Sequence, residues 1–397
     1  MNMNMRATKN SHERALVLTR VAVAALAGGL GGCADSQSLP APSVAGSATA
    51  TVTPTTARAS TLRANRRRSL ARLVGQKLVV SYRGMHAPPA RLLRRIRRGE
   101  VGGVILFSEN VPSSGATGVR HVVARLQAAA HAGRNPPLLI ATDQEGGDVR
   151  RMPGPPRVSP RELGSMPRAK VHATAVATGR SLRQMGIGVD LAPVVDRPTH
   201  ASSFLGTRAF ATSSQPDASA SIAFAGGLQE AGVAATAKHY PGLGSSGARN
   251  TDVAAVILST PRTTMARERA GFIRHVRAGT RLVMVSNATY LAYDPQRPAA
   301  VSRKIIQRLR RDGFRRVVIS DELHAPALKR FGASTAAMAT RAGVDLLLFA
   351  NSSGEAEFRA LLTDSDAGRV THRLLERQVR RIIALKRWIA TSTGPRG

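Results

Sequence analysis

Charged and amide side chains stand at the ends of five short apolar runs in this sequence: Asp143 and Glu145, Asp196, Lys238 and His239, Asn287, and Asp321 and Glu322. Carboxylates accept hydrogen bonds from sugar hydroxyls, whereas lysine and arginine donate to them. A carboxylate can also attack an anomeric carbon and form a covalent glycosyl-enzyme that water then hydrolyses. If the fold brings these side chains together, they suit a polyhydroxylated ligand.

A metal site is the competing interpretation of the same residues. Apart from His324, His239 is the only histidine at these run ends, and the chain contains no HxH or HExxH pattern. The glycines at 146 and 147 lack the Lys-Ser/Thr partner of a phosphate-binding loop. The residue types therefore favour carbohydrate chemistry, and we expect no metal or organic cofactor.

Eight apolar runs recur along the chain, each of them continuous instead of alternating: "KLVVSY" (77–82), "GVILF" (103–107), "PLLIATD" (137–143), "IGVDLAP" (187–193), "AATAKHY" (234–240), "LVMVSNA" (282–288), "VVISD" (317–321) and "GVDLLLF" (343–349). Continuous runs are typical of strands buried on both faces of a parallel sheet. The segments between them, such as 170–186, have apolar residues at helical spacing. Eight strand–helix units predict a single α/β domain, a (β/α)₈ TIM-type barrel, over residues 66–392.

This fold places its active sites at the C-terminal ends of the strands, on the loops that follow them. The charged residues named above occupy those ends in the sequence. Fold and residue placement therefore predict one cavity at which carboxylates and cations from several strands meet.

The first 65 residues differ from the rest. Four basic residues lie within residues 6–20, followed by the apolar stretch "VAVAALAGGLGG", which is too short to span a bilayer comfortably, and by Cys33. This order is similar to the lipobox of bacterial lipoproteins. Residues 1–33 are thus expected to be a lipoprotein signal peptide that ends in a lipidated Cys33 at the outer face of the cell membrane. An ordinary secretory signal, and hence a secreted protein, is the alternative.

Residues 34–65 are rich in Ser, Ala, Thr and Pro and lack hydrophobic periodicity, which predicts a flexible tether. Over the whole chain, 58 Lys and Arg stand against 24 Asp and Glu, a formal net charge of +34. The arginines are scattered and no nucleic-acid-binding motif occurs, so nucleic acid is not an expected partner. A basic surface still favours acidic partners such as anionic lipid or wall polymer. The protein is expected to be a monomer.

Seven segments resemble glycoside hydrolase family 3: "GGVILFSENV" (102–111), "DQEGGDVRRM" (143–152), "GIGVDLAPVVD" (186–196), "LGTRAF" (205–210), "AATAKHYPGLG" (234–244), "VVISDEL" (317–323) and "AGVDLLL" (342–348). Within the family they are similar to the bacterial β-N-acetylglucosaminidases, or β-hexosaminidases, that recycle cell-wall muropeptides. The resemblance covers roughly residues 70–390 in the right order.

The resemblance implies a role for each matching position. Asp321 matches the catalytic nucleophile of the family. Five further side chains match residues that bind the sugar: Asp143, Arg151, Arg208, Lys238 and His239. Glu145, in contrast, is expected to be a structural residue that binds the backbone or an arginine.

One loop departs from the family pattern. In the acetylglucosaminidase branch, an Asp-x-His dyad in the loop after "KHFPGHG" serves as general acid/base, but here its places fall at Arg249 and Thr251. No histidine occurs in "GSSGARNTDVAAV" (244–256), and the only carboxylate there is Asp252. Asp252 is therefore the candidate acid/base, with Glu322 as the alternative.

Together these features predict a retaining exo-glycosidase that removes β-linked N-acetylhexosamine (GlcNAc) from cell-wall-derived saccharides through a covalent glycosyl-enzyme. A β-glucosidase specificity is an alternative, because the diverged loop contacts the N-acetyl side of the sugar in the family. A catalytically weak or silent glycan-binding lipoprotein is a third interpretation. It follows from the missing dyad, since a positioned acid/base contributes ~10²–10⁴-fold to the rate.

Overall fold

The computed structural model describes residues 54–84, 86–210 and 218–392, and the side chains of 54–60 are not among those described. Cys33, the predicted signal peptide and residues 34–53 of the predicted tether lie outside this part of the chain. No helix within the described ranges is both long enough and apolar enough to cross a membrane.

Eight parallel strands form the centre of the structure. They are β1 (Leu78–Val80), β2 (Gly103–Ile105), β3 (Leu139–Thr142), β6 (Val189–Asp190), β7 (Ala234–Tyr240), β9 (Leu282–Val285), β12 (Val317–Ser320) and β13 (Leu347–Phe349). Each lies within one of the eight apolar runs, so every run predicted as a strand contains one.

The strands follow one another around a ring in chain order, from β1 through β12, and β13 pairs with β1 through Leu78 and Leu347. An isolated parallel bridge between Ile319 and Leu346 links the last two strands and nearly closes the ring. The predicted (β/α)₈ TIM-type barrel is therefore confirmed.

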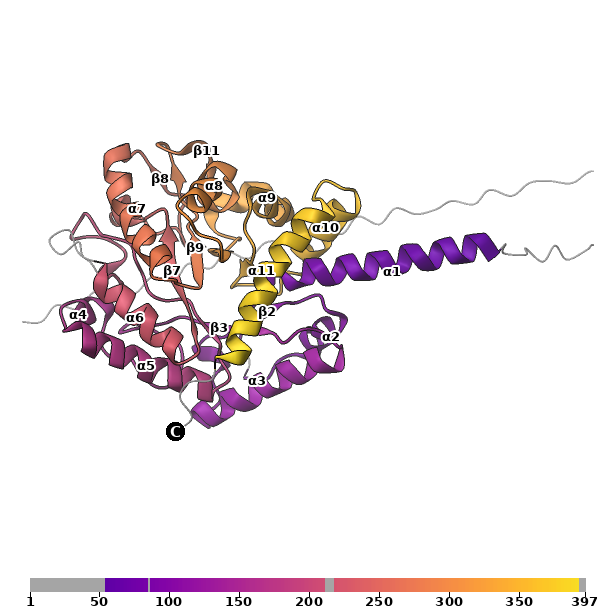
Figure 1. Cartoon of the computed structure of the whole chain (residues 1–397), viewed down its shortest axis with the longest axis horizontal. Helices are drawn as coiled ribbons and strands as arrows, with labels where there is room; N and C mark the ends of the chain where they lie inside the picture. The colour runs from indigo at the N-terminus through magenta and orange to yellow at the C-terminus, as the bar shows by residue number, and fades with distance from the viewer. Residues whose placement is uncertain (1–53, 85, 211–217, 393–397) are drawn as a thin grey trace, which may run out of the picture. The chain divides into compact units, whose positions relative to one another are not determined.

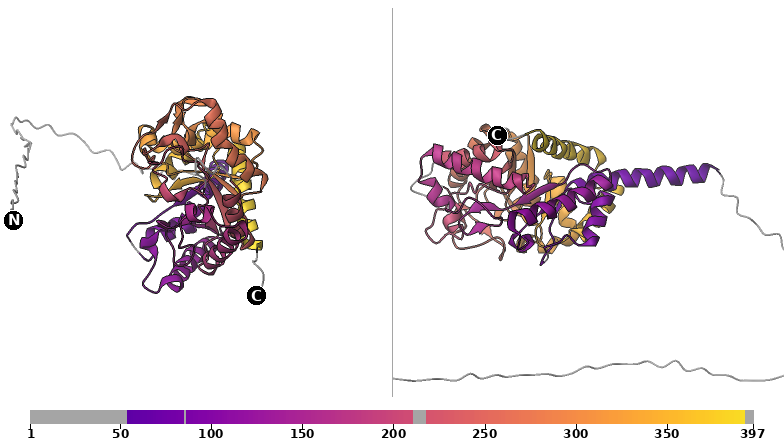
Figure 2. Two further views of the ribbon diagram at one scale, coloured as in Figure 1. Left: turned by 90° about the vertical axis from the view of Figure 1, so that its left-hand side faces the viewer. Right: turned by 90° about the horizontal axis from the view of Figure 1, so that it is seen from below.

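Helices lie outside the ring of strands in all three ribbon views (Figures 1 and 2). They are α1 (Pro54–Gln76), α2 (Ala90–Arg98), α3 (Gly115–Ala132), α4 (Pro160–Gly164), α5 (Arg168–Gln184), α6 (Ser219–Glu230), α7 (Arg262–Arg277), α8 (Arg303–Arg311), α9 (Thr335–Ala342), α10 (Glu355–Asp366) and α11 (His372–Thr391). The helical spacing seen in 170–186 corresponds to α5.

Two buried apolar clusters explain why the strand runs are continuous. Inside the barrel, Val79, Ile105 and Leu282 belong to one cluster, whereas their neighbours Leu78 and Val104 pack toward the helices in the other. Successive side chains of a strand point to opposite faces. Because both faces are covered, most positions along these strands are apolar on either side.

Helix α11 lies across one end of the barrel and packs against its inward-facing side chains. Ile382 and Leu385 belong to the same cluster as the inward-facing strand residues. A Cβ added at Gly188, just before β6, would lie 2.7 Å from Cγ2 of Ile389. Since Gly188 precedes its strand, α11 covers the N-terminal end of the barrel, opposite the predicted active site.

Helix α1 begins earlier than the sequence suggests. Residues 54–65, which were predicted to belong to the tether, form its first part. This correction has a local cause, since the Ala, Leu and Arg residues of this stretch are good helix formers. Leu70 and Val74, one turn apart near its end, are buried, whereas residues 61–69 are exposed.

Two small sheets form within the loops that follow β3, β7 and β9. Strands β4 (Gln144–Gly146) and β5 (Val149–Arg150) form an antiparallel hairpin directly after β3. Strands β8 (Ile257–Leu258), β10 (Thr289–Tyr290) and β11 (Asp294–Pro298) form a second sheet from the loops after β7 and β9.

Candidate active site

A cavity of about 310 Å³ lies at the C-terminal ends of the barrel strands. All seven side chains predicted from the sequence to bind substrate or react with it line this cavity: Asp143, Arg151, Arg208, Lys238, His239, Asp252 and Asp321. These side chains belong to five separate stretches of the chain, so the barrel brings residues that are distant in sequence to one cavity.

The hairpin after β3 places Asp143 beside Arg151. The N–H of Arg151 donates to the carbonyl oxygen of Asp143 at 3.2 Å, which closes the hairpin. Its turn contains Gly146 and Gly147, with φ of 108° and 55°, a backbone conformation that favours glycine. Within the described residues, the buried Nε of Arg151 has no hydrogen-bond partner, so a donor is available at the cavity wall.

A buried ion network forms the floor beside the hairpin. Nζ of Lys238 lies 2.7 Å from Oδ1 of Asp143 and 2.7 Å from Oε1 of Glu145. Arg208, at the end of the short 3₁₀ helix Gly206–Arg208, donates to both oxygens of Glu145 at 2.8 and 2.7 Å. Glu145 thus binds an arginine, as expected, and holds two cavity cations in place.

The network fixes the charges of its members. Burial alone would raise the pKa of Glu145, but Lys238 and Arg208 lower it to about 2. Burial alone would lower the pKa of Lys238, yet the carboxylates of Asp143 and Glu145 raise it above its ordinary value. Both groups therefore remain ionised over the whole neutral range, and Lys238 stays a hydrogen-bond donor.

An irregularity at the end of β7 explains how two successive residues line one cavity. Side chains normally alternate along a strand, so Lys238 and His239 would point to opposite faces. The pairing of β7 with β9 shifts register between Ala237 and Tyr240. Register irregularities of this kind re-aim side chains near active sites.

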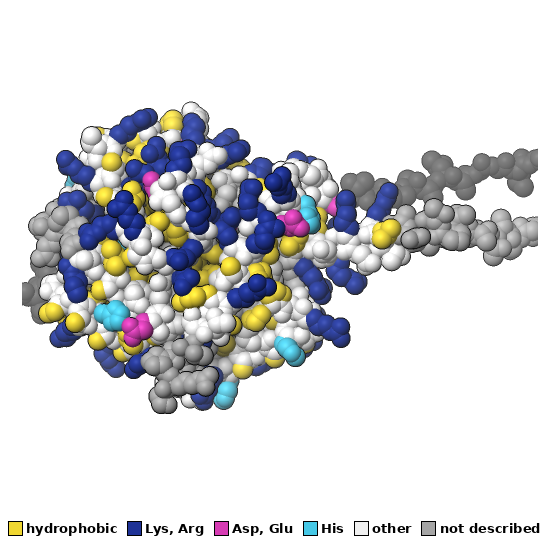
Figure 3. Space-filling model, viewed as in Figure 1, with side chains coloured by type: hydrophobic (Ala, Val, Ile, Leu, Met, Phe, Trp, Pro, Cys, Tyr) yellow, Lys and Arg dark blue, Asp and Glu magenta, His cyan; other side chains and the backbone are white. Residues whose placement is uncertain are grey.

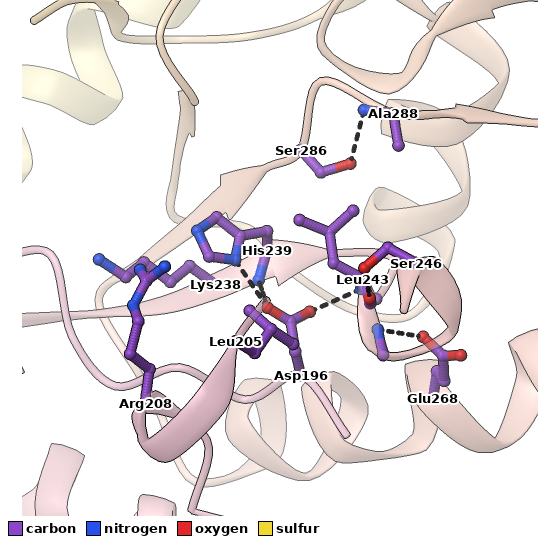
Figure 4. Close-up of polar contacts among 12 residues, drawn as sticks. Asp196, Leu205, Arg208, Lys238, His239, Leu243, Ser246, Glu268, Ser286 and Ala288 are labelled. Atoms are coloured by element: carbon purple, nitrogen blue, oxygen red, sulfur yellow. Dashed lines mark hydrogen bonds and ion pairs between the residues drawn. The ribbon is translucent and has the colours of Figure 1, made fainter. Parts of the chain in front are cut away.

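The carboxylate of Asp196 contacts His239 and holds its ring in one orientation (Figure 4). Its Oδ2 lies 2.6 Å from Nδ1 of His239 and accepts the backbone N–H of the same residue at 3.1 Å. Its Oδ1 accepts the N–H of Leu243 at 2.8 Å, so one buried carboxylate joins the histidine to the following loop. Glu268 of α7 accepts the N–H of Gly244 at 3.0 Å and holds the same loop from the outside.

Asp321 follows β12 at the centre of the lining. Its N–H donates to the carbonyl of Val285 at 2.9 Å, and its Oδ1 accepts the N–H of Glu322 at 2.8 Å. Burial raises the pKa of Asp321 to about 6; the charge of His239 opposes this shift and that of Asp252 adds to it. His239 and Asp252 are thus within electrostatic reach of Asp321, which is largely ionised at pH 7.

Asp252 reaches the cavity from the diverged loop. The loop turns at Asn250, whose Oδ1 accepts the N–H of Asp252 at 2.9 Å, and the neighbouring Thr251 is buried while Asp252 is exposed. An exposed carboxyl at the mouth of the cavity, close to Asp321, is well placed to exchange protons with a leaving group or with water.

Glu322, the alternative acid, is held by the backbone instead. It accepts N–H groups from His324, at 2.8 Å, and from Ala350 and Asn351 after β13. His324 lines the cavity, and its Nε2 lies 2.7 Å from Oε1 of Glu357. Hydrogen bonds to Glu322 and Glu357 raise the pKa of His324 to about 10, so this ring carries a positive charge.

Sequence reasoning missed several lining residues. Arg83 and Asn351 follow the first and the eighth run, and Nη1 of Arg83 donates to Oδ1 of Asn351 at 3.0 Å. The same rule of polar residues after strand ends could have found both. Phe107, at the end of the second run, and Phe204 add apolar surface, which a rule that looks for polar residues does not find. Asn287 does not line the cavity, and its side chain donates to the carbonyl of Glu322 at 2.7 Å.

A barrel that gathers carboxylates and cations in one cavity at its C-terminal face has the architecture of an enzyme that acts on carbohydrates. The sequence profile described as "Glycosyl hydrolase family 3 N terminal domain" matches residues 72–385. The chain therefore belongs to glycoside hydrolase family 3 and is a glycoside hydrolase.

Individual relatives agree with this assignment. The chain is 33% identical over 330 residues to an uncharacterized secreted glycosyl hydrolase of Arthroderma benhamiae, covering 80% of this chain and 93% of that protein. It is 35% identical over 271 residues to a β-hexosaminidase of Nitrosomonas eutropha, covering 65% of this chain and 76% of the relative.

Solved structures show the same likeness. A family 3 β-N-acetylglucosaminidase from Paenibacillus sp. superposes with a TM-score of 0.77 at 30% identity; the match covers 83% of this chain but only 64% of that one. A β-N-acetylhexosaminidase from Beutenbergia cavernae gives a TM-score of 0.73 at 31% identity, covering 80% of this chain and 98% of that one.

Proposed function

We propose that the protein is a retaining, exo-acting β-N-acetylhexosaminidase that removes GlcNAc from cell-wall-derived saccharides. The observation that carries this proposal is the common cavity of Asp143, Arg151, Arg208, Lys238, His239, Asp252 and Asp321. Relatives described as β-hexosaminidase and β-N-acetylglucosaminidase support the choice of sugar.

In the proposed reaction, ionised Asp321 attacks the anomeric carbon while the glycosidic oxygen leaves. The C–O bond to the aglycone breaks as the bond to the Asp321 carboxylate forms, which gives a covalent glycosyl-enzyme. Water then attacks the same carbon and releases the sugar with its original configuration. The surrounding cations stabilise the ionised nucleophile, since Lys238 and His239 both lower its pKa against the effect of burial.

Asp252 is the proposed general acid/base of both steps. As an acid it protonates the departing oxygen, and as a base it then takes a proton from the attacking water. Its place on the exposed loop leaves room for an aglycone and for water, whereas Glu322 already accepts several backbone N–H groups. The loop therefore keeps an acid although it lacks the dyad histidine.

Sugar binding falls to the remaining cavity residues. The carboxylate of Asp143 accepts hydrogen bonds from hydroxyl groups, whereas Arg151, Lys238 and His239 donate to ring substituents. Arg208 adds a further donor, held in one orientation by Glu145.

The N-terminal segment supports an envelope location. The lipobox-like order of residues 1–33 and the secreted relative both favour export, with the cysteine at position 33 as the proposed lipid attachment site. Replacement of Cys33 by Ala should move the protein from the membrane fraction to the soluble fraction. A wild-type protein already found in the soluble fraction would contradict the anchor and leave the glycosidase proposal intact.

Turnover of 4-nitrophenyl β-N-acetylglucosaminide, beside the matching β-glucoside and a natural wall disaccharide, tests the function. Asp148→Asn is a matched control, because Asp148 is an exposed aspartate of the same face that does not line the cavity. Activity on the acetylated sugar, lost in Asp321→Asn and kept in Asp148→Asn, is expected. Preference for the β-glucoside, or activity that survives Asp321→Asn, would reject the proposed specificity or nucleophile.

A further inference from the structure

Two cavities lie on the helical layer, away from the catalytic face. One, of about 430 Å³, is lined by residues of α8, α9 and α11, among them Arg303, Arg310, Arg341, Arg377 and Arg381. The other, of about 140 Å³, shares Arg381 and adds Arg281, Arg315, Arg316 and Trp388. We name these two cavities the arginine groove.

The arginine groove belongs to the N-terminal end of the barrel. Arg281 directly precedes β9, Arg316 precedes β12, and Gly343 of the larger cavity follows α9 on the way to β13. The groove thus lies at the opposite strand ends from the catalytic cavity. Figure 3, viewed as Figure 1, shows Lys and Arg side chains gathered over the face where α8 and α11 lie, with few acidic side chains between them.

Carboxylates compensate only part of the positive charge in the arginine groove. Among the described residues that line either cavity, none is Asp or Glu. The buried carboxylate of Asp345 binds both Arg310, at 2.8 Å, and Arg381, at 2.6 Å. Arg341 lies 3.5 Å from Asp364. Arg315 and Arg316 donate to backbone carbonyl oxygens instead of carboxylates.

Among the described residues, three groove arginines have donors that no protein acceptor binds. In the part of the chain that the structure describes, Arg303 and Arg377 have no hydrogen-bond or ion-pair partner, and both are exposed at the rim of the groove. The buried Nε of Arg281 also lacks an acceptor, although its guanidinium lies 4.2 Å from the ring centre of Trp388. Leaving a buried donor unsatisfied costs free energy, which an anionic ligand would offset.

We propose that the arginine groove binds a linear polyanion that carries phosphate groups along its length. The planar guanidinium matches phosphate oxygens with two parallel hydrogen bonds, which is why arginine is common at phosphate sites. The arginines line hollows between helices, so they converge on a narrow chain instead of facing a flat bilayer. Binding there leaves the catalytic cavity open and requires neither Asp321 nor Asp252.

The chain carries its own reporter of binding, because it contains a single tryptophan and this residue lines the groove. The whole protein is titrated with inorganic polyphosphate while the fluorescence of Trp388 is followed, with inorganic monophosphate and phosphatidylglycerol vesicles as parallel probes. We expect a saturable change with polyphosphate, much weaker binding of monophosphate, and an affinity for polyphosphate that falls steeply with added salt.

The test variant is Arg303→Gln/Arg377→Gln, and its matched control is Arg120→Gln/Arg262→Gln, which removes two exposed arginines elsewhere. Loss of two charged contacts should weaken polyphosphate binding roughly tenfold or more in the test variant and leave the control and Asp321→Asn unchanged. Glycosidase turnover of the test variant should equal that of wild type, which shows that it is folded. Equal weakening in both double variants, a Trp388 response to vesicles but not to polyphosphate, equal affinity for monophosphate, or no binding at all would overturn the proposal.

Discussion

The catalytic cavity and the arginine groove lie at opposite ends of one barrel. Charges of both signs line the first, whereas the charged residues that line the second are all arginines. The catalytic cavity is lined by four carboxylates and by four arginine or lysine side chains, and its core cations are paired with Asp143 and Glu145. The arginine groove is lined by arginines without a single Asp or Glu among its described residues. Positive charge is therefore balanced in the catalytic cavity and in excess in the arginine groove.

This difference separates two uses of charge: ion pairs that position side chains, and unpaired cations that attract a ligand. Paired charges such as Lys238 with Glu145 hold side chains in fixed places, which favours recognition of a neutral, hydroxyl-rich sugar. Unpaired charges such as Arg303 and Arg377 create a field that attracts an anion from solution. Substitutions that affect one end without the other test this separation.

The largest expected effect is on the nucleophile. Asp321→Asn removes the carboxylate that forms the covalent bond, so kcat/KM on 4-nitrophenyl β-N-acetylglucosaminide should fall by roughly 10⁴-fold or more. Polyphosphate binding should not change. A loss of less than about tenfold in steady-state assays would assign the nucleophile to another group.

Replacement of the proposed acid should depend on the leaving group. In Asp252→Asn, kcat on a natural disaccharide should drop by ~10²–10⁴-fold, because an alkoxide leaves slowly without a proton. The first step with the 4-nitrophenyl glycoside should change much less, since nitrophenolate needs little protonation, and pre-steady-state release of nitrophenol measures this step. Equal losses on the two substrates would remove Asp252 from the role of acid.

Glu145→Gln should reduce stability as well as turnover. It leaves Lys238 and Arg208 buried without their shared carboxylate, and breaking a buried ion pair costs about 3–5 kcal/mol. Urea unfolding should show this loss, whereas the exposed Arg303→Gln/Arg377→Gln pair should change the free energy of unfolding by less than about 1 kcal/mol.

The stabilising effect of Glu145 should also depend on pH. Its pKa is lowered from the ordinary 4.5 to about 2 in the folded protein, so its contribution is fully present above pH 4.5 and disappears as the pH falls toward 2. Glu145→Gln should lack this part of the acid sensitivity. An identical pH profile for wild type and variant would show that the ion network contributes nothing to folding.

The smallest expected effect is a shift of the pH profile. Asp321 must be ionised to react, and its raised pKa places the acid limb of kcat/KM at about pH 6. The charge of Asp252 adds to this pKa, so Asp252→Asn should move the limb to lower pH. An acid limb that moves to higher pH, or stays in place, would show that the charge of Asp252 does not raise the pKa of Asp321.

The sequence predicted the barrel well because its strands are buried on both faces. That burial makes each run continuously apolar, and the eight runs "KLVVSY" to "GVDLLLF" identify the eight strands. It predicted less well where composition is ambiguous. The Ser, Ala and Thr residues before Arg66 resembled a tether, but α1 begins at Pro54.

The site was predictable wherever a polar residue follows a strand. Asp143 and Asp321 satisfy that rule, and so do Arg83 and Asn351, to which it was not applied. Lys238 lies in the last part of β7 itself. The register shift that turns both Lys238 and His239 toward the cavity has no local sequence signature, because it depends on the pairing of β7 with β9.

The arginine groove could not have been predicted from the sequence either. Its residues come from loops and from α8, α9 and α11, and each arginine by itself resembles an ordinary solvated helix position. Only tertiary packing shows that they surround common hollows.

The position of α11 has a consequence for how the chain is made. Strand β13 completes the ring with β1, and α11 then covers the N-terminal end of the barrel with Ile382 and Leu385. A chain from which α11 is missing therefore exposes this apolar barrel end, so the domain cannot complete its core until α11 has been synthesised.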